Sequence, residues 1–194
     1  MIAAIVLAAG KSERMGQPKA LLTYRGVTFL DRILLAIENS EISETIVVVG
    51  HNREEIASQV RLGVVVSNPD YESGMVTSLK VGIRALPDEA SGAAIFLVDH
   101  PMIDEKTINA LVSRFEPGVI IAPVYDGRRG HPVLFSRTVL YEILELPDTI
   151  GANAVVRRKP DRVIEVLVDE PGILLDIDTP EELKRFRLTQ DDRC

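Results

Sequence analysis

Continuous apolar runs that alternate with segments of helical spacing constrain the fold of this chain more than any other feature. The runs are unbroken by polar residues, which is typical of strands that are buried on both faces of a sheet. They lie at residues 2–7, 45–49, 64–66, 94–98 and 119–122. Segments with apolar residues three or four positions apart lie at residues 29–37, 54–60, 76–86 and 106–115. This alternation predicts an α/β fold, a Rossmann-like and mostly parallel sheet with helices on both faces.

The pattern changes in the last third of the chain. An Asp126-Gly127 pair between short apolar segments predicts a tight turn and a small antiparallel excursion of the sheet. Asp104 is in place to cap the helix at 106–115. The other expected elements are a helix at 137–146, a loop through Asp148 and Gly151, strands at 163–168 and 174–177, and a last helix entered at Thr179-Pro180.

Length and charge narrow the class of protein. The chain has 194 residues, and we expect one domain over residues 1–187, followed by a polar tail at 188–194. The formal net charge of −7 argues against a protein that binds nucleic acid by neutralising phosphates. The one cysteine, Cys194, excludes an intrachain disulfide and a cysteine-based zinc site. The apolar start, residues 1–9, is too short to span a bilayer, so we expect a cytoplasmic protein with no membrane partner.

The strongest chemical signal follows the first apolar run. Residues 7–19 read Leu-Ala-Ala-Gly-Lys-Ser-Glu-Arg-Met-Gly-Gln-Pro-Lys, with two glycines and three cations directly after a buried strand. Open α/β sheets bind ligands at the carboxyl ends of strands, and glycine backbone can approach phosphate oxygens closely. The segment is not a Walker loop, which would need a glycine at Ile5, and it is not a Gly-x-Gly-x-x-Gly fingerprint. It predicts a phosphate-binding loop, with a solvated surface loop as the alternative.

Acidic residues at two places are suited to a divalent metal. Asp99 ends the apolar run at 94–98, and a carboxylate at that end of a strand, opposite a triphosphate, suits Mg²⁺. Asp176 and Asp178 alternate along the expected strand at 174–177, which places both on one face. The alternatives are a turn-capping role for Asp99 and helix-entry acids at 176 and 178.

These blocks resemble the MobA-like NTP transferase family, nucleotidyltransferases with a Rossmann-like sheet, and most of all its branch that attaches CMP or GMP to the molybdopterin phosphate. The resemblance is carried by residues 7–19 and extends over most of the chain. Further matching blocks are Gly74-Met75-x-x-Ser78-Leu79, Arg129-Gly130-His131-Pro132-Val133 and Asp176-x-Asp178-Thr179-Pro180-Glu181. The chain departs from the family at Val98, where glycine is usual before the aspartate, and at Asn153, where an acceptor-binding arginine is expected.

The resemblance implies a role for each of these residues. The catalytic residues would be Lys19, Arg14 and Asp99. The metal would be held by Asp99 and Asp178, with Asp176 as the fallback for the second ligand. The acceptor side would involve His100 and His131. The nucleotide would contact Leu7, Ala8, Ala9, Gly10, Arg14, Lys19, Asn68, Gly74 and Ser78.

The implied activity is a Mg²⁺-dependent transfer of a nucleoside monophosphate to a phosphorylated small molecule, with release of pyrophosphate. The Ala8-Ala9 start resembles the cytidylyltransferase version of the loop, which favours CTP as the donor. The favoured acceptor is the molybdopterin cofactor, which implies a partner from molybdoenzyme maturation. Two alternatives stay open: a sugar phosphate or another small metabolite as acceptor, and a non-catalytic nucleotide-binding or cofactor-chaperoning module of the same fold.

Overall fold

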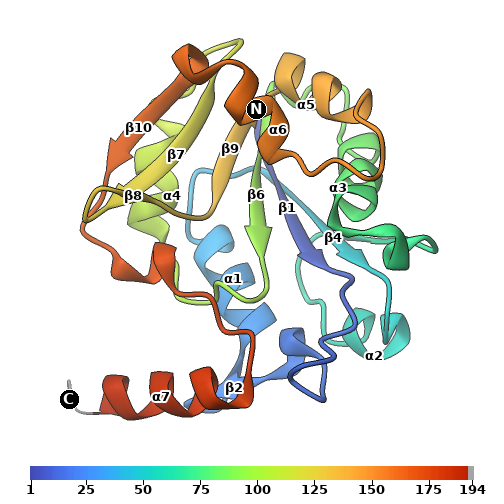
Figure 1. Ribbon diagram of the computed structural model, residues 1–194, viewed down its shortest axis with the longest axis vertical. Helices are drawn as coiled ribbons and strands as arrows, with labels where there is room; N and C mark the ends of the chain where they lie inside the picture. Colours follow the sequence, from blue (N-terminus) through green and yellow to red (C-terminus); the bar gives the residue numbers. More distant parts are fainter. Residues whose placement is uncertain (192–194) are drawn as a thin grey trace.

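One mixed sheet forms the centre of the computed structural model, which describes residues 1–191 (Figure 1). Its strands follow the order β10-β7-β9-β6-β1-β4-β5, and β8 pairs with β7 outside that path. The strands of this sheet are β1 Ile2–Ala8, β4 Glu44–Val49, β5 Val64–Ser67, β6 Gly92–Leu97, β7 Ile120–Tyr125, β8 Arg128–Arg129, β9 Val133–Ser136 and β10 Val163–Leu167. β1 runs parallel to β4 and β6, β4 to β5, and β7 to β10. The predicted fold class is confirmed.

The antiparallel excursion lies where the sequence predicted it. β9 is inserted between β6 and β7 and runs antiparallel to both. The β7–β8 turn holds Asp126 and Gly127 at φ angles of 49° and 69°, the left-handed conformation that a tight hairpin requires. The insertion separates β7 and β10 from the parallel strands, and the cavity described below opens beside it.

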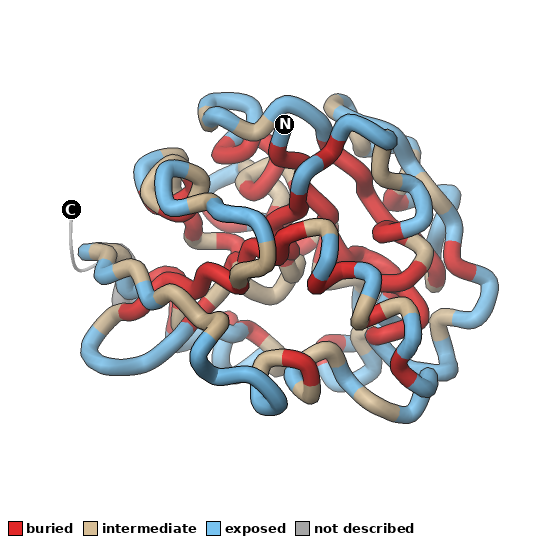
Figure 2. The backbone as a smooth tube through the Cα atoms, turned by 90° about the horizontal axis from the view of Figure 1, so that it is seen from above, coloured by how far each residue is buried: buried red, intermediate tan, exposed pale blue. Residues whose placement is uncertain are grey.

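Helices cover both faces of the sheet because its strands are apolar on both sides. Alternate residues of β1 belong to two different core clusters, Ala4 and Val6 to one and Ala3 and Ile5 to the other. The first cluster contains α1, α2 and α4, and the second contains α3, α5 and α6. Figure 2 shows the buried residues gathered between exposed outer segments. The helices are α1 Phe29–Glu38, α2 Arg53–Ala57, α3 Met75–Arg84, α4 Glu105–Val112, α5 Arg137–Leu144 and α6 Asn153–Arg158.

A third, smaller core lies beside the sheet at the lower end of Figure 1, where α7 (Pro180–Asp191) lies near β2. The rings of Tyr24 and Phe186 are 4.7 Å apart between centroids, and Met15 from the loop after β1 belongs to the same cluster. The last helix is therefore packed against the segment that carries the predicted phosphate-binding loop.

The structure corrects two boundaries. Residues 174–177 do not form a strand: a 3-10 helix spans Pro171–Leu174, and the chain then continues without a sheet partner. Only one backbone bond joins this stretch to the end of β6, from the Ile177 amide to the Asp99 carbonyl at 3.0 Å. The predicted tail at 188–194 begins inside α7, which continues to Asp191, and residues 192–194 lie outside the described part.

The other predicted helices and strands are present, with ends that differ by at most a few residues, and Asp104 caps α4 by accepting from the Thr107 amide. One hairpin of two strands and one helix had not been expected. Thr23–Tyr24 (β2) and Val27–Thr28 (β3) form a hairpin around Arg25-Gly26, and α6 occupies the end of the expected loop after Gly151. No helix among residues 1–191 is long and apolar enough to cross a bilayer.

Candidate active site

A pocket of about 380 Å³ opens at the carboxyl ends of β1 and β6. It is lined by the loop after β1, by the start of α3 and by the segment before α7. The predicted site residues that line it are Leu7, Ala8, Ala9, Gly10, Arg14, Lys19, Ser78, Asp99 and Asp178. Sequence positions far apart thus meet at one end of the sheet, as expected for an open α/β fold. We call this space the nucleotide pocket.

Two predicted nucleotide contacts lie beside this pocket instead of in its wall. Asn68 is buried, and its side-chain amide donates to the hydroxyls of Thr77 and Ser78, both at 2.9 Å. It therefore fixes the start of α3, with Ser78 facing the pocket. Gly74 precedes α3 at a φ of 113°, a conformation that favours glycine, and lines a neighbouring cavity.

The loop after β1 is folded back so that Lys19 returns to the pocket. Ser12 has a φ of 54°, and its hydroxyl accepts a hydrogen bond from the Lys19 amide at 3.1 Å. Its carbonyl accepts from the Met15 amide at 2.9 Å. Lys19 then begins a short 3-10 helix (Lys19–Leu21), with Pro18 before it. Ser12 and Pro18 of the motif thus position Lys19 through the backbone of the loop.

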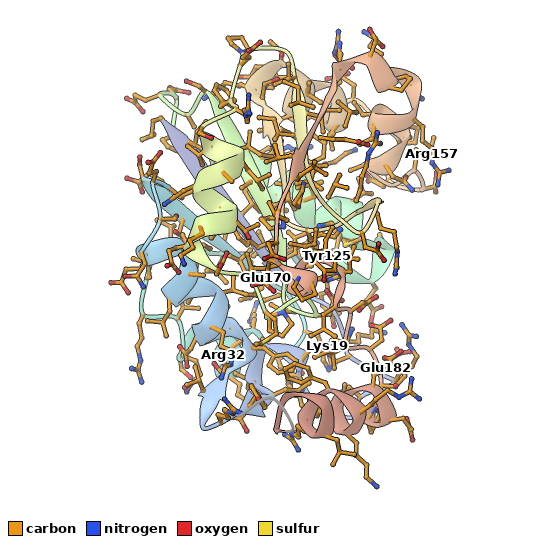
Figure 3. All side chains as sticks on the ribbon, turned by 90° about the vertical axis from the view of Figure 1, so that its left-hand side faces the viewer. Lys19, Arg32, Tyr125, Arg157, Glu170 and Glu182 are labelled. Atoms are coloured by element: carbon orange, nitrogen blue, oxygen red, sulfur yellow. The ribbon has the colours of Figure 1, made fainter. Side chains whose placement is uncertain are left out.

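Lys19 lies between two carboxylates. Its ammonium is 3.2 Å from Asp99 Oδ2 and also pairs with Asp178, which in turn pairs with Arg14. Burial lowers the pKa of Lys19, but the hydrogen bond with Asp178 and the charge of Asp99 outweigh it, and the net shift is upward. The hydrogen bond from Lys19 lowers the pKa of Asp178. Figure 3 shows Lys19 between the sheet and α7. Both shifts favour the charged forms of Lys19 and Asp178 at neutral pH.

A second group of side chains joins Asp99 from the other side. The ligand atoms of Asp99, His100 and Asp176 all lie within 4.8 Å of one another. His100 Nδ1 is 2.9 Å from Asp99 Oδ1. Burial raises the pKa of Asp99, but this hydrogen bond and the charge of Lys19 reverse the shift and hold the pKa at about 2. Burial and the nearby charges of Asp99 and Asp178 raise the pKa of Asp176.

This group has the donor set of a divalent-metal site. Two carboxylates and an imidazole converge, and such sets bind Mn²⁺ and related ions, while Mg²⁺ depends mainly on the oxygens. Burial and the negative charges of Asp99 and Asp178 raise the pKa of Asp176, and a bound cation would offset this repulsion. Asp178 is held instead by Lys19 and Arg14. The geometry therefore favours Asp176 over Asp178 as the companion of Asp99.

A larger cavity of about 730 Å³ adjoins the nucleotide pocket and shares Leu7, Met75 and Leu97 with it. Its lining is mostly apolar and comes from β6, β7, β9, α3, α6 and the segment before α6. We call it the acceptor cavity. Among its polar lining residues are Arg129, His131, Asp148, Asn153 and Arg157. Arg157 lies on α6, well away from Lys19 in Figure 3.

His131, which lines the acceptor cavity, lies beside His100, with ring centroids 4.9 Å apart. Burial lowers the pKa of His131 to about 4, and the neighbouring His100 acts in the same direction. The Nδ1 atom of His131 is buried without a hydrogen-bond partner among the described residues. The preceding Gly130 is required by space, because a Cβ there would lie 2.3 Å from the Ile173 carbonyl oxygen. The two predicted acceptor histidines are thus brought together.

Sequence reasoning missed the part of the site that depends on distant contacts. Asp178 was ranked above Asp176 because of its position in the block shared with the family, and Lys80 was not singled out at all. Lys80 is buried and bonds to the segment that leads to α6. The sequence held one sign of this burial. Lys80 is a charged residue directly after Leu79 and three residues before Ile83, on the apolar stripe of a helix.

Known proteins share this fold and much of this sequence. Residues 4–163 match the family described as MobA-like NTP transferase domain. The chain is 31% identical to the molybdenum cofactor cytidylyltransferase of Escherichia coli (strain K12), over 92% of this chain and 91% of the relative. It is 28% identical to the nicotine blue oxidoreductase of Paenarthrobacter nicotinovorans, over 95% and 96% of the two chains.

A solved structure is equally similar along its whole length. Rv0371c from Mycobacterium tuberculosis H37Rv superposes with a TM-score of 0.84 at 29% identity, over 96% of this chain and 97% of that one. A structure of Rv0371c in complex with manganese superposes with a TM-score of 0.77 at 27% identity, over 97% and 98%. A relative of the same fold therefore binds a divalent metal.

Proposed function

Because this chain belongs to the MobA-like NTP transferase family, we propose that it transfers a nucleoside monophosphate from a nucleoside triphosphate to a phosphorylated small molecule. The acceptor phosphate attacks the α-phosphorus, the bond from the α-phosphorus to the bridging oxygen breaks, and pyrophosphate leaves. A phosphate monoester is already anionic, so the reaction needs no strong general base. Rate enhancement then depends on alignment and on neutralising negative charge.

The observation that supports this proposal most is the position of Lys19. Its ammonium lies at the end of the loop after β1, 3.2 Å from Asp99, and Lys19 forms part of the wall of the nucleotide pocket. A triphosphate in the nucleotide pocket would compete with Asp178 for Lys19 and Arg14, since both cations prefer the higher charge density of phosphate oxygens. Lys19 is then placed to stabilise the charge that develops as pyrophosphate departs.

Asp99, Asp176 and His100 would hold a divalent metal, Mg²⁺ or Mn²⁺, which when bound polarises phosphate oxygens. The low pKa of Asp99, about 2, keeps this carboxylate ionised under all ordinary conditions. The hydrogen bond between Asp99 and His100 orients both side chains. Asp178 acts as the counter-ion that holds Lys19 and Arg14 in place before the nucleotide binds.

The acceptor cavity supports a ring-bearing acceptor over a sugar phosphate. Most of its lining is apolar, and Ile95, Ile120, Val133 and Phe135 can pack against a flat apolar body. We therefore propose a molybdopterin-type acceptor. CTP is the proposed donor, because the methyl groups of Ala8 and Ala9 in the nucleotide pocket narrow the space for a purine.

The test is a matrix of donors and acceptors. The protein is incubated with Mg²⁺, each of the four ribonucleoside triphosphates, and either molybdopterin or glucose 1-phosphate, and pyrophosphate is measured. We expect release with CTP and molybdopterin, and little without an acceptor. Pyrophosphate release with glucose 1-phosphate but not with molybdopterin would favour the sugar-phosphate alternative. No acceptor-dependent release, together with tight nucleotide binding, would favour a non-catalytic module.

A further inference from the structure

Lys80 is a buried cation that the proposed reaction does not use. It lies in α3 and is 7% exposed, next to Leu79 and Ile83, which belong to the core. Removing an ammonium group from water is costly unless fixed partners replace its hydration. A lysine that folds into such a position must therefore be held by acceptors, and the structure shows which groups they are.

Both acceptors of Lys80 come from the segment after α5. Its Nζ donates to the Leu146 carbonyl oxygen and to Asp148 Oδ1, the latter at 2.7 Å. Leu146 lies two residues beyond Leu144, where α5 ends, and the helix dipole favours a cation near this end of the helix. The Asp148 side chain is 59% exposed, so the ion pair is buried at its lysine end only.

The segment that Lys80 holds is a wall of the acceptor cavity. Asp148, Thr149, Gly151, Ala152 and Asn153 all line that cavity. This wall also approaches the start of α3, because a Cβ on Gly74 would lie 3.9 Å from the Asp148 carbonyl oxygen. The same helix therefore borders the nucleotide pocket through Met75 and Ser78 and is joined to the acceptor wall through Lys80.

We propose that Lys80 is a positioning residue that ties residues 147–152 to α3 and so sets the acceptor wall relative to the nucleotide pocket. The inference rests on the proposed function, since it assigns the larger cavity to the acceptor. Without the Lys80 ammonium, the wall loses two charge-assisted hydrogen bonds. The nucleotide pocket keeps all of its own contacts. Acceptor binding should therefore weaken while nucleotide binding stays the same.

The test uses 1-naphthyl phosphate as the probe, because it joins two fused apolar rings to a phosphate monoester. Its Kd is measured by fluorescence, and the Kd of CTP with Mg²⁺ is measured by calorimetry. Lys80→Met keeps the apolar stem and removes the charge, and Asp148→Asn keeps the shape of its partner. Lys106→Met is the control, since Lys106 is exposed on α4, on the opposite face of the sheet.

We expect Lys80→Met to weaken 1-naphthyl phosphate binding about tenfold, the scale of one lost charge-assisted bond. Asp148→Asn should act in the same direction by less, and the Kd of CTP should stay within about twofold in both variants, below the scale of one lost bond. Lys106→Met should change neither. Glucose 1-phosphate should bind the wild type more weakly than 1-naphthyl phosphate.

Several results would overturn this assignment. One is an unchanged Kd for 1-naphthyl phosphate in a folded Lys80→Met protein, and another is an equal weakening of both ligands. If circular dichroism shows that Lys80→Met does not fold, the test depends on Asp148→Asn alone. An unchanged Kd for 1-naphthyl phosphate in that variant, or an equal weakening of both ligands, would then overturn the assignment. If the wild type binds no 1-naphthyl phosphate, the cavity is not the acceptor site and the role of Lys80 falls. Acceptor-dependent pyrophosphate release from CTP would in that case still support the proposed function.

Discussion

The nucleotide pocket and the acceptor cavity adjoin each other, yet their linings differ in charge and in size. The pocket gathers Lys19, Arg14, Asp99 and Asp178 as charged groups that face one another. The cavity is almost twice as large, about 730 Å³ against 380 Å³, and is mostly apolar. Its nearest buried cation, Lys80, is turned into the wall and paired there. Under the proposed function, charge is concentrated where phosphates react, while shape selects the acceptor.

Loss of Lys19 should be the most damaging change on the charged side. Lys19→Ala should lower kcat/KM by roughly 10²–10³, the scale of one lost charge-stabilising donor. Lys11→Ala is the matched control, since Lys11 lines the same pocket but is 38% exposed and pairs with Glu72. Its effect should be far smaller. Wild-type kcat/KM in a correctly folded Lys19→Ala protein would contradict the role of charge in the nucleotide pocket.

The two carboxylates of the last block should differ in a way that sharpens the assignment of the metal. Asp176→Asn should weaken Mn²⁺ binding by about 100-fold or more, since even an outer-shell partner is worth about 10–100-fold. Asp99→Asn should do at least as much and should abolish most Mg²⁺-dependent activity. Asp178→Asn should leave the metal Kd nearly unchanged and raise the KM for the nucleotide. Calorimetry with Mn²⁺ gives the ranking, and a larger loss for Asp178→Asn would reverse the two roles.

Base preference should be a smaller effect because it depends on shape. A methyl group in a close-fitting pocket discriminates by about 1–3 kcal/mol, so we expect CTP to exceed GTP at least about tenfold in kcat/KM. Ala9→Gly should narrow this gap. Ala9 is only 4% exposed and lines the nucleotide pocket, so it is part of a fixed wall. Equal use of CTP and GTP by the wild type would contradict the assignment of the donor.

The last expected effect is on stability at acid pH instead of on activity, and it concerns His131 in the acceptor cavity. The pKa of His131 falls from 6.5 to about 4 on folding, so the unfolded chain binds more protons between these values. Stability is therefore full above pH 6.5 and declines as the pH falls toward 4, by at most about 3 kcal/mol. His131→Gln should flatten this part of a denaturation profile. Asp99, with a pKa of about 2, titrates below this window.

The same contrast explains how much could be predicted from the sequence. The loop of residues 7–19 was predicted because its strand, glycines and cations are contiguous, so local chemistry fixed its place. The ranking of Asp178 above Asp176 came from the family block alone, whereas the surroundings of the two carboxylates depend on the 3-10 helix at Pro171–Leu174 and on the bond from Ile177 to Asp99. These contacts join residues far apart in the chain, and periodicity within the segment does not report them.

The acceptor side was the hardest to predict for a similar reason. Its walls come from β6, β9, α3 and α6, which are brought together only by the sheet order and by the Lys80 contacts. The block at 129–133 was recognised, but its packing against Ile173 through Gly130 was not. Motifs of reactive groups are thus visible in one sequence, whereas a cavity made by packing is not.

The central claim is that the acceptor phosphate attacks the α-phosphorus of the nucleotide. Parallel reactions with CTP labelled at the α- or the γ-phosphorus, each with Mg²⁺ and molybdopterin, test it directly. Attack on the α-phosphorus predicts that the α-label appears in the acceptor product and the γ-label in pyrophosphate, both only when the acceptor is present. A γ-label in the acceptor or in orthophosphate, or an α-label that never leaves CTP, would contradict it.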